Sequence, residues 1–175
     1  MQKIEKLFDI NILLMTLFSS LETISDEKRI ELIYDMQATI PRELRGDSAV
    51  LLRLLTKILI FVFQNTDKKE IILSLEAPEY FVYEETISFK IQNTNIDKEK
   101  ILKFLETNLS KDLEILEGKI IYEGDADIHL DIPFMINELG YRRHYRLPAT
   151  SMLGKMVLLM GESEQVSQSI KKMFN

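Results

Sequence analysis

The segment DSAVLLRLLTKILIFVFQ, residues 47–64, decides the fold. Its apolar residues fall on nearly every side of a helix, which is typical of a helix that is buried on more than one side. Asp47 or Ser48 can cap the start of this helix, because a side-chain oxygen of either residue can accept hydrogen bonds from the first free backbone N–H groups. The most apolar part, residues 49–63, is 15 residues long and carries two basic residues. It is therefore too short and too charged for a membrane span, and we expect a central core helix.

Two elements are expected before this helix. Apolar residues recur at helical spacing in residues 7–24, which predicts an amphipathic helix. Residues 25–28 (SDEK) are expected to form a turn, and the alternation in residues 29–36 predicts a strand. Pro41 and Gly46 mark the loop that leads into the core helix.

The segments after the core helix predict more strands than helices. Residues 70–76 and 86–92 are expected to be strands of a hairpin, and residues 97–116 a helix that ends at Glu117-Gly118. Residues 119–122 and 128–134 are expected to form a second hairpin. Because most strands are joined by hairpins, we expect an α+β fold, a two-layer sandwich with helices on one face of a mixed β-sheet.

Composition narrows the class of protein further. The chain has 175 residues with a net charge of −6, which disfavours nonspecific binding to nucleic acid or to anionic membranes. It has no cysteine and only two histidines, which excludes a disulfide scaffold, a thiolate zinc site and a histidine-rich metal centre. The start of the chain has no signal-peptide pattern, so a cytoplasmic protein is expected.

Five segments in order carry a resemblance to a known family. Residues 1–136 resemble the ATP-binding domain of sensor histidine kinases, which has the Bergerat-type (GHKL) fold. The matching segments are IPRELRGD at 40–47, the core helix at 51–66, the strand and loop at 86–96, the last helix and following strand at 109–120, and the closing strand at 128–134. The resemblance implies a histidine-kinase-like ATPase fold and a role in two-component signalling.

The resemblance also marks where a nucleotide would bind, and the residues there depart from the family. On the core helix, the family places two asparagines four residues apart, and the second holds magnesium; this chain has Lys57 and Phe61. A benzene ring cannot ligate magnesium, which needs hard oxygen donors. In the first glycine box, Asn93 stands where the family has the adenine-binding aspartate, and Asn95 and Asp97 replace glycines. We therefore interpret these five positions as a vestigial nucleotide site.

The ATP lid and the phosphoacceptor histidine have no counterpart either. The interval where the family has its glycine-rich lid contains no glycine from Glu79 to Glu117. A cradle of free backbone N–H groups for phosphates therefore has no evident place. His129 is expected in a strand and His144 in a linker, and neither has the helical surroundings of a phosphoacceptor histidine.

The end of the chain predicts two further parts. Residues 137–154 are expected to be a linker, with a basic cluster of Arg142, Arg143 and Arg146 that could dock an acidic or phosphorylated partner. Residues 155–175 resemble the first strand and helix of a receiver domain, although Gly161-Glu162 matches only half of the acidic pair expected there. This domain order is that of a hybrid kinase in a phosphorelay.

Each of these residues also has an ordinary structural interpretation. Lys57 can be a surface lysine, Phe61 a core residue, and Asn93 and Asn95 turn formers. The basic cluster can be a solvated linker. His129, between Asp127 and Asp131, suggests a metal site only if a further ligand is near, and a structural histidine is the simpler interpretation.

Three functions remain open. The favoured one is a pseudokinase-like signalling module that binds no magnesium-ATP, needs no cofactor, and contacts a kinase or receiver domain; a homodimer is left open. The second is a divergent but active histidine kinase domain that uses ATP and magnesium, with Asn93 binding adenine. The third is an interaction or structural domain that shares only the fold.

Overall fold

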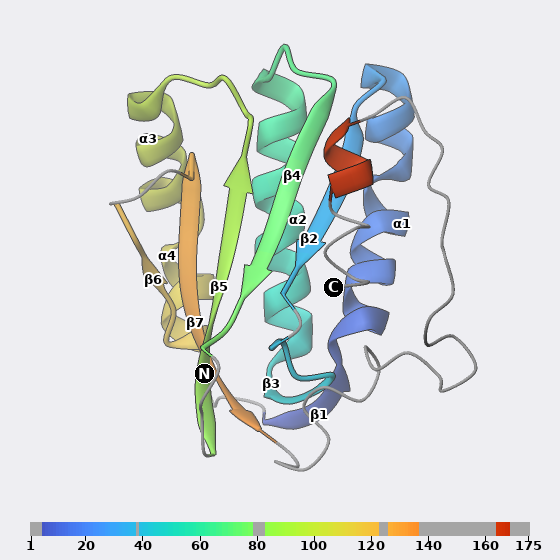
Figure 1. Ribbon diagram of the computed structural model, residues 1–175. Helices are drawn as coiled ribbons and strands as arrows, with labels where there is room; N and C mark the ends of the chain where they lie inside the picture. The colour runs from blue at the N-terminus through green and yellow to red at the C-terminus, as the bar shows by residue number, and fades with distance from the viewer. Residues whose placement is uncertain (1–4, 38, 79–82, 123–125, 137–163, 169–175) are drawn as a thin grey trace, which may run out of the picture.

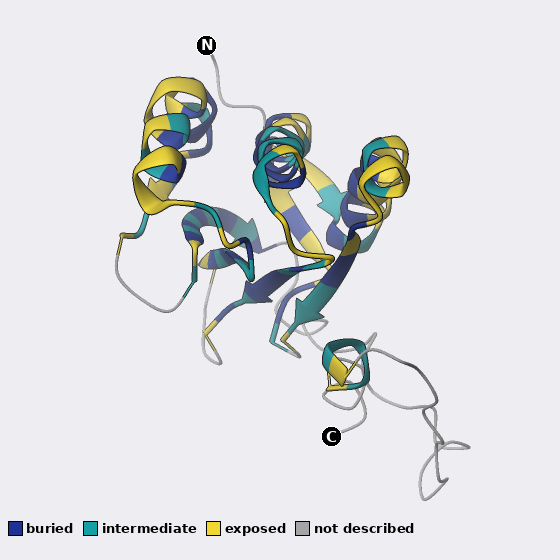
Figure 2. Ribbon diagram, turned by 90° about the horizontal axis from the view of Figure 1, so that it is seen from above, coloured by how far each residue is buried: buried dark blue, intermediate teal, exposed yellow. Residues whose placement is uncertain are grey.

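The computed structural model describes residues 5–37, 39–78, 83–122, 126–136 and 164–168. The helices of the sandwich lie on one face of a single sheet (Figures 1 and 2). The helices are α1 (Ile10–Lys28), α2 (Ser48–Asn65), α3 (Lys98–Asn108) and α4 (Ser110–Leu116). The strands are β1 (Lys6–Asp9), β2 (Glu31–Met36), β3 (Glu43–Gly46), β4 (Glu70–Glu76), β5 (Glu84–Gln92), β6 (Lys119–Ile120) and β7 (Ile128–Ile136).

The sheet is mixed, as the sequence predicted. Its strand order is β1-β3-β7-β5-β4-β2, and β6 pairs with β7 beside this path. Of the described strand pairs, β2 and β4 alone run parallel. The expected α+β class with helices on one face of a mixed sheet is therefore confirmed.

Alternation along the strands separates a core face from an open face. In β7, Ile128, Leu130 and Ile132 are buried, whereas His129 and Asp131 are only partly buried. Because successive side chains of a strand point to opposite faces, the apolar set faces the helices and the polar set faces away from them. The core therefore lies between the sheet and the helical layer.

The central helix α2 supplies much of this core. Eight of its 18 residues are buried, and the Asp47 carboxylate caps it by accepting a hydrogen bond from the Val50 N–H at 3.0 Å. By length and composition, α2 is the one described helix that could cross a membrane. It is longer than the apolar run suggested, but its apolar residues are buried against the sheet and the other helices, as in a core helix.

The start of the chain differs from the prediction. Residues 6–9 form β1, and α1 begins at Ile10 because Asp9 caps it: one carboxylate oxygen accepts from the N–H groups of Asn11 and Ile12. The expected turn at 25–28 is wrong, since α1 continues to Lys28 and ends at Arg29 in a left-handed conformation. The polar residues 25–28 are as compatible with the exposed end of a helix as with a loop between two elements.

A second short strand was also missed. Residues 43–46, expected to be loop, form β3, which pairs with β1 through the Phe8–Leu44 register and with the end of β7. Gly46 is required here because a Cβ would lie 2.9 Å from the Phe134 ring. Four-residue strands carry too short an alternation to be recognised from sequence, and their stability comes from the pairing.

The helix expected over residues 97–116 is two helices. It breaks at Leu109, which is fully buried and joins α3 to α4. The predicted stop is confirmed: Glu117 ends α4 in a left-handed conformation, and the Gly118 N–H donates to the Leu113 carbonyl at 2.8 Å. The predicted pairing of the last two strands is confirmed as well.

Most of the C-terminal part lies outside the described residues. The predicted linker at 137–154, its Arg142, Arg143 and Arg146, and the predicted receiver-like strand at 155–160 all lie there. Of the predicted receiver-like helix, residues 164–168 are described and are helical. This short helix lies on the side of the sheet opposite α1 and α2 (Figure 2).

Candidate functional site

The predicted site residues lie on α2 and on the connection from β5 to α3, beside the α3–α4 pair. Lys57 and Phe61 are one helical turn apart on α2, so they share a face of the helix. Asn93, Asn95 and Asp97 follow the end of β5. In the structure, Lys57 contacts α4 and Phe61 contacts α3. Asn93 and Asn95 instead form hydrogen bonds with the start of β4 and with the connection between α2 and β4, respectively.

Lys57 belongs to a three-residue ion cluster that joins α2 to α4. Its ammonium group lies 2.8 Å from Asp112 Oδ2, and Arg53 Nη2 lies 2.6 Å from Asp112 Oδ1. Arg53 Nε also donates to Oδ1 at 3.1 Å. The Asp112 side chain is 5% exposed, whereas those of Arg53 and Lys57 are about half exposed. Both carboxylate oxygens of Asp112 are thus engaged by cations from α2.

The electrostatics of Asp112 follow from this cluster. Burial by itself would raise the pKa of the carboxyl group, but hydrogen bonds from Arg53 and Lys57 oppose it. The net result is a pKa of Asp112 below its ordinary value. The same contact raises the pKa of Arg53. Asp112 is therefore a carboxylate with two fixed positive neighbours at neutral pH.

Phe61 is paired with an aromatic ring of α3. The rings of Phe61 and Phe104 are stacked, with centroids 4.0 Å apart and planes 7° apart. Both side chains are partly buried and pack against the core. A stack at this distance leaves no room for a ligand between the rings.

The β5–α3 connection is fixed by its own hydrogen bonds. Asn93 and Asn95 have φ values of 64° and 52°, in the left-handed region that asparagine tolerates better than most residues. Asn93 Nδ2 donates to the Glu70 carbonyl at 2.6 Å, and Asn95 Nδ2 donates to Asp67 at 2.9 Å. Asp97 precedes α3 but makes no side-chain capping hydrogen bond.

Sequence reasoning missed the residue that anchors this connection, Thr94. It is fully buried; its N–H donates to Asp127 Oδ2 at 2.7 Å, and its carbonyl accepts from the Thr66 hydroxyl at 2.6 Å. These bonds tie the connection to the end of α2 and to the start of β7. The two partners of Thr94 lie 28 and 33 residues away from it in sequence, so no local signal indicated them.

The histidine flagged in the sequence, His129, contacts one of its two aspartate neighbours, Asp131. His129 Nε2 lies 3.0 Å from Asp131 Oδ1, and the Ser88 hydroxyl donates to the same oxygen at 2.6 Å. Asp127 is engaged by Thr94. Within the described ranges, no group of three or more His, Cys, Asp or Glu side chains could hold a metal ion.

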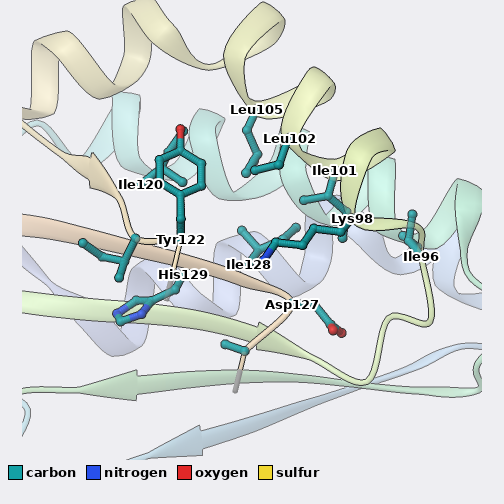
Figure 3. Close-up of a pocket in the computed structure, with 12 residues that line it drawn as sticks. Ile96, Lys98, Ile101, Leu102, Leu105, Ile120, Tyr122, Asp127, Ile128 and His129 are labelled. Atoms are coloured by element: carbon teal, nitrogen blue, oxygen red, sulfur yellow. The ribbon is translucent and has the colours of Figure 1, made fainter. Parts of the chain in front are cut away.

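A small cavity lies beside α3, next to the end of the β5–α3 connection. It has a volume of about 240 Å³ and lies between α3 and the β6–β7 hairpin (Figure 3). Seven of its twelve lining residues are isoleucine or leucine, and the others include Lys98, Tyr122, Asp127 and His129. None of the five predicted site residues lines this cavity, although its wall includes Ile96, which lies between Asn95 and Asp97 in the sequence.

Comparisons with solved structures identify the fold. The histidine kinase AdeS of Acinetobacter baumannii matches with a TM-score of 0.55 and 12% identity over 78% of this chain and 68% of that chain. The catalytic domain of the histidine kinase ThkA matches with a TM-score of 0.52 and 16% identity over 75% of this chain and 94% of that domain. ThkA in complex with the response regulator protein TrrA matches with a TM-score of 0.53 and 17% identity over 75% of this chain and 41% of that chain.

In the sequence comparisons, no protein-family model and no curated protein matches the chain. The structural likeness is a likeness of fold. The chain has the fold of histidine kinase catalytic domains, which confirms that part of the resemblance seen in the sequence.

Proposed function

We propose that this chain is a signalling module with the histidine kinase catalytic fold that acts through protein contacts and does not hold magnesium-ATP in the manner that the fold implies. One observation carries the proposal. The two α2 positions where the family presents ligands to the nucleotide, Lys57 and Phe61, are each occupied by a contact within the domain.

The donor set at these positions does not suit magnesium. Mg²⁺ requires hard oxygen ligands in octahedral geometry, and neither a phenyl ring nor an ammonium group supplies one. The carboxylate beside them, Asp112, has both oxygens occupied by Arg53 and Lys57. Two positive side chains also disfavour a divalent cation through charge repulsion. We therefore propose no reaction step that uses a bound nucleotide at this site.

The α3–α4 junction supports the same proposal. A single residue, Leu109, separates the two helices, and it is fully buried. Its N–H donates to the Leu105 carbonyl, and its carbonyl accepts from the Leu113 N–H. A phosphate-binding lid needs free backbone N–H groups on a segment that can approach the ligand, and this junction offers neither.

A divergent but active ATP-binding domain is the alternative, and one observation favours it. Asn93 uses its amide nitrogen to bind the Glu70 carbonyl, and no described hydrogen bond engages its side-chain oxygen. That oxygen could accept a hydrogen bond from an adenine amino group. The alternative then requires that the phosphates bind without an oxygen ligand from residue 61.

Thermal unfolding of the full chain with ATP, with and without Mg²⁺, tests the proposal. A ligand at one hundred times its dissociation constant adds about 2.7 kcal/mol to stability, so binding would raise the melting temperature clearly. We expect no magnesium-dependent rise for the wild type or for Phe104→Ala, which opens the aromatic stack. A rise that EDTA abolishes would establish the alternative. A rise in Phe104→Ala only would show that the stack, and not the donor set, keeps nucleotide out.

The partner that we propose is another signalling protein, a kinase or a receiver domain. ThkA was solved in complex with a response regulator protein, so one protein of this fold makes such a contact. The basic residues Arg142, Arg143 and Arg146 would suit an acidic or phosphorylated surface. Calorimetric titration with isolated receiver domains measures this directly, and the absence of any saturable heat across a panel of them would contradict it.

A further inference from the structure

The open face of the sheet, which points away from the helices, is not evenly exposed. Successive side chains of a strand point to opposite faces, so on β2 Leu32 joins the core and Ile33 points to the open face. Ile33 is nevertheless only 6% exposed, although it is not part of the core cluster. On the same face, Glu84 and Thr86 of β5 are exposed. Part of the chain therefore covers the open face at β2 and leaves it uncovered at the start of β5.

The neighbouring strand shows how far this cover extends. Ile33 is paired with Ile72 of β4, which is partly buried. Ser74, the next residue of β4 on the same face, is 5% exposed, and its hydroxyl donates to the side-chain oxygen of Gln92 on β5. We call Ile33, Ile72 and Ser74 the covered area. It has two apolar side chains on a sheet face that is otherwise mostly polar.

Helix 164–168 is the described segment that lies over the covered area. It lies in front of β2 in Figure 1, and on the side of the sheet opposite α1 and α2 in Figure 2. Its end residues are exposed, whereas the three middle residues are partly buried, namely Gln165, Val166 and Ser167. A helix of five residues is too short to be stable alone in water. Its burial therefore indicates that it packs against the rest of the chain.

A buried polar atom supports this contact. Gln165 Oε1 is inaccessible to solvent and has no hydrogen-bond partner among the described residues. On a helix surrounded by water this oxygen would be hydrated, so protein atoms must shield it. A buried acceptor that lacks a donor weakens the contact that buries it. We therefore expect the helix to be held loosely.

We infer that helix 164–168 is a reversible cover of the open face, docked on the covered area through Val166, the apolar residue among its five. Three partly buried residues form far less than the roughly 800 Å² per partner of a standard protein–protein interface. The helix is tethered to the sheet by the same chain, and this raises its effective concentration enough to support a small contact. A protein that binds this face of β2 and β4 must first displace the helix. The inference does not rest on the proposed function.

Thiol protection in the full chain tests the cover, and the chain is suited to it because it has no cysteine of its own. Ile33→Cys places a thiol in the covered area, and Thr86→Cys places one on the exposed part of the same face. With a maleimide, Ile33→Cys should react at least about tenfold more slowly than Thr86→Cys, because its labelling waits for a local opening. Ile72→Cys repeats the measurement on β4, and melting curves check that each variant folds. Equal rates at the covered and exposed positions would overturn the inference.

Substitutions in the helix show whether it is the cover. Val166→Asp places a charge in the apolar contact and should speed the labelling of Ile33→Cys about tenfold or more without lowering the melting temperature. Gln165→Met removes the unpaired acceptor at similar size and should slow the labelling. Gln168→Asp, at the exposed end of the helix, is the matched control and should change neither quantity.

Two outcomes of the helix substitutions would contradict the inference. An unchanged labelling rate in Val166→Asp would show that another part of the chain covers Ile33. A large fall in melting temperature would show that the helix belongs to the core and does not leave it reversibly. The rate should also be independent of protein concentration, because the contact is within one chain. Protection that increases with concentration would place the helix of a second copy on this face and overturn the inference.

Discussion

The helices on the two sides of α2 are attached to it by different forces. α1 packs against α2, and among the described residues no hydrogen bond or ion pair joins the two helices. On the other side, α4 is joined to α2 by the Arg53–Asp112–Lys57 cluster, and α3 by the Phe61–Phe104 stack. Apolar packing is non-directional, whereas the ion cluster fixes which atoms meet. The first side thus supports the core, and the second side fixes the surroundings of Lys57 and Phe61.

The largest effect is expected on the apolar side. Leu17→Ala on α1 removes a fully buried side chain and should cost about 3 kcal/mol of unfolding free energy, because it leaves a cavity in the core. Chemical denaturation measures this cost, which should be the same at pH 7 and at pH 4. Thr16→Ala, at the exposed neighbouring position, is the control and should change stability by less than about 0.5 kcal/mol. A cost below about 1 kcal/mol for Leu17→Ala would show that α1 contributes little to the core.

An intermediate, pH-dependent effect is expected on the polar side. Asp112→Asn keeps the shape of the side chain but loses charge-assisted hydrogen bonds, which should cost on the order of 1–2 kcal/mol at pH 7. Because the pKa of Asp112 is lowered in the folded state, its stabilising contribution is present above the pKa of an unfolded aspartate and is lost as the pH falls through the folded pKa.

The difference between wild type and Asp112→Asn should therefore begin to shrink as the pH falls below the pKa of an unfolded aspartate, about 4. It should disappear only below the lowered pKa of the folded carboxyl group, where the wild-type side chain is neutral as well. Denaturation curves of both proteins across this pH range measure the difference. Lys57→Met removes only one half-exposed partner and should cost less than about 1 kcal/mol. A difference that does not change with pH would mean that the cluster contributes through packing rather than through charge.

The smallest effect concerns a feature that the two sides share. α1 ends at Arg29 with φ 55°, and α4 ends at Glu117 with φ 53°, so a non-glycine residue occupies the left-handed conformation at both ends. Arg29→Gly should stabilise the protein by about 0.5–1 kcal/mol, because glycine adopts this conformation without the clash of a Cβ. Arg29→Ala keeps the clash and should give no such gain, as thermal unfolding of the two variants would show.

The sequence predicted the elements whose signals are local. The core helix with a cap at Asp47 or Ser48, the strand at 70–76 and the stop at Glu117-Gly118 follow from periodicity, capping residues and turn residues within a few positions. The mixed sheet with helices on one face followed from the order of these elements. The short strands β1 and β3 were missed because each is four residues long and is held by its pairing with the other, more than 30 positions away.

The same distinction holds at the site. Lys57 and Phe61 could be singled out from the sequence because the family that the chain resembles has two asparagines at these positions, and their spacing places them on one face of a helix. Their partners Asp112 and Phe104 lie 55 and 43 residues further along, and nothing in the intervening sequence indicates which residues will meet them. Local sequence determines which face of a helix or strand is apolar, since that depends on neighbours a few residues apart. Only the tertiary structure decides which charged and aromatic groups are brought together, because that depends on how the whole core packs.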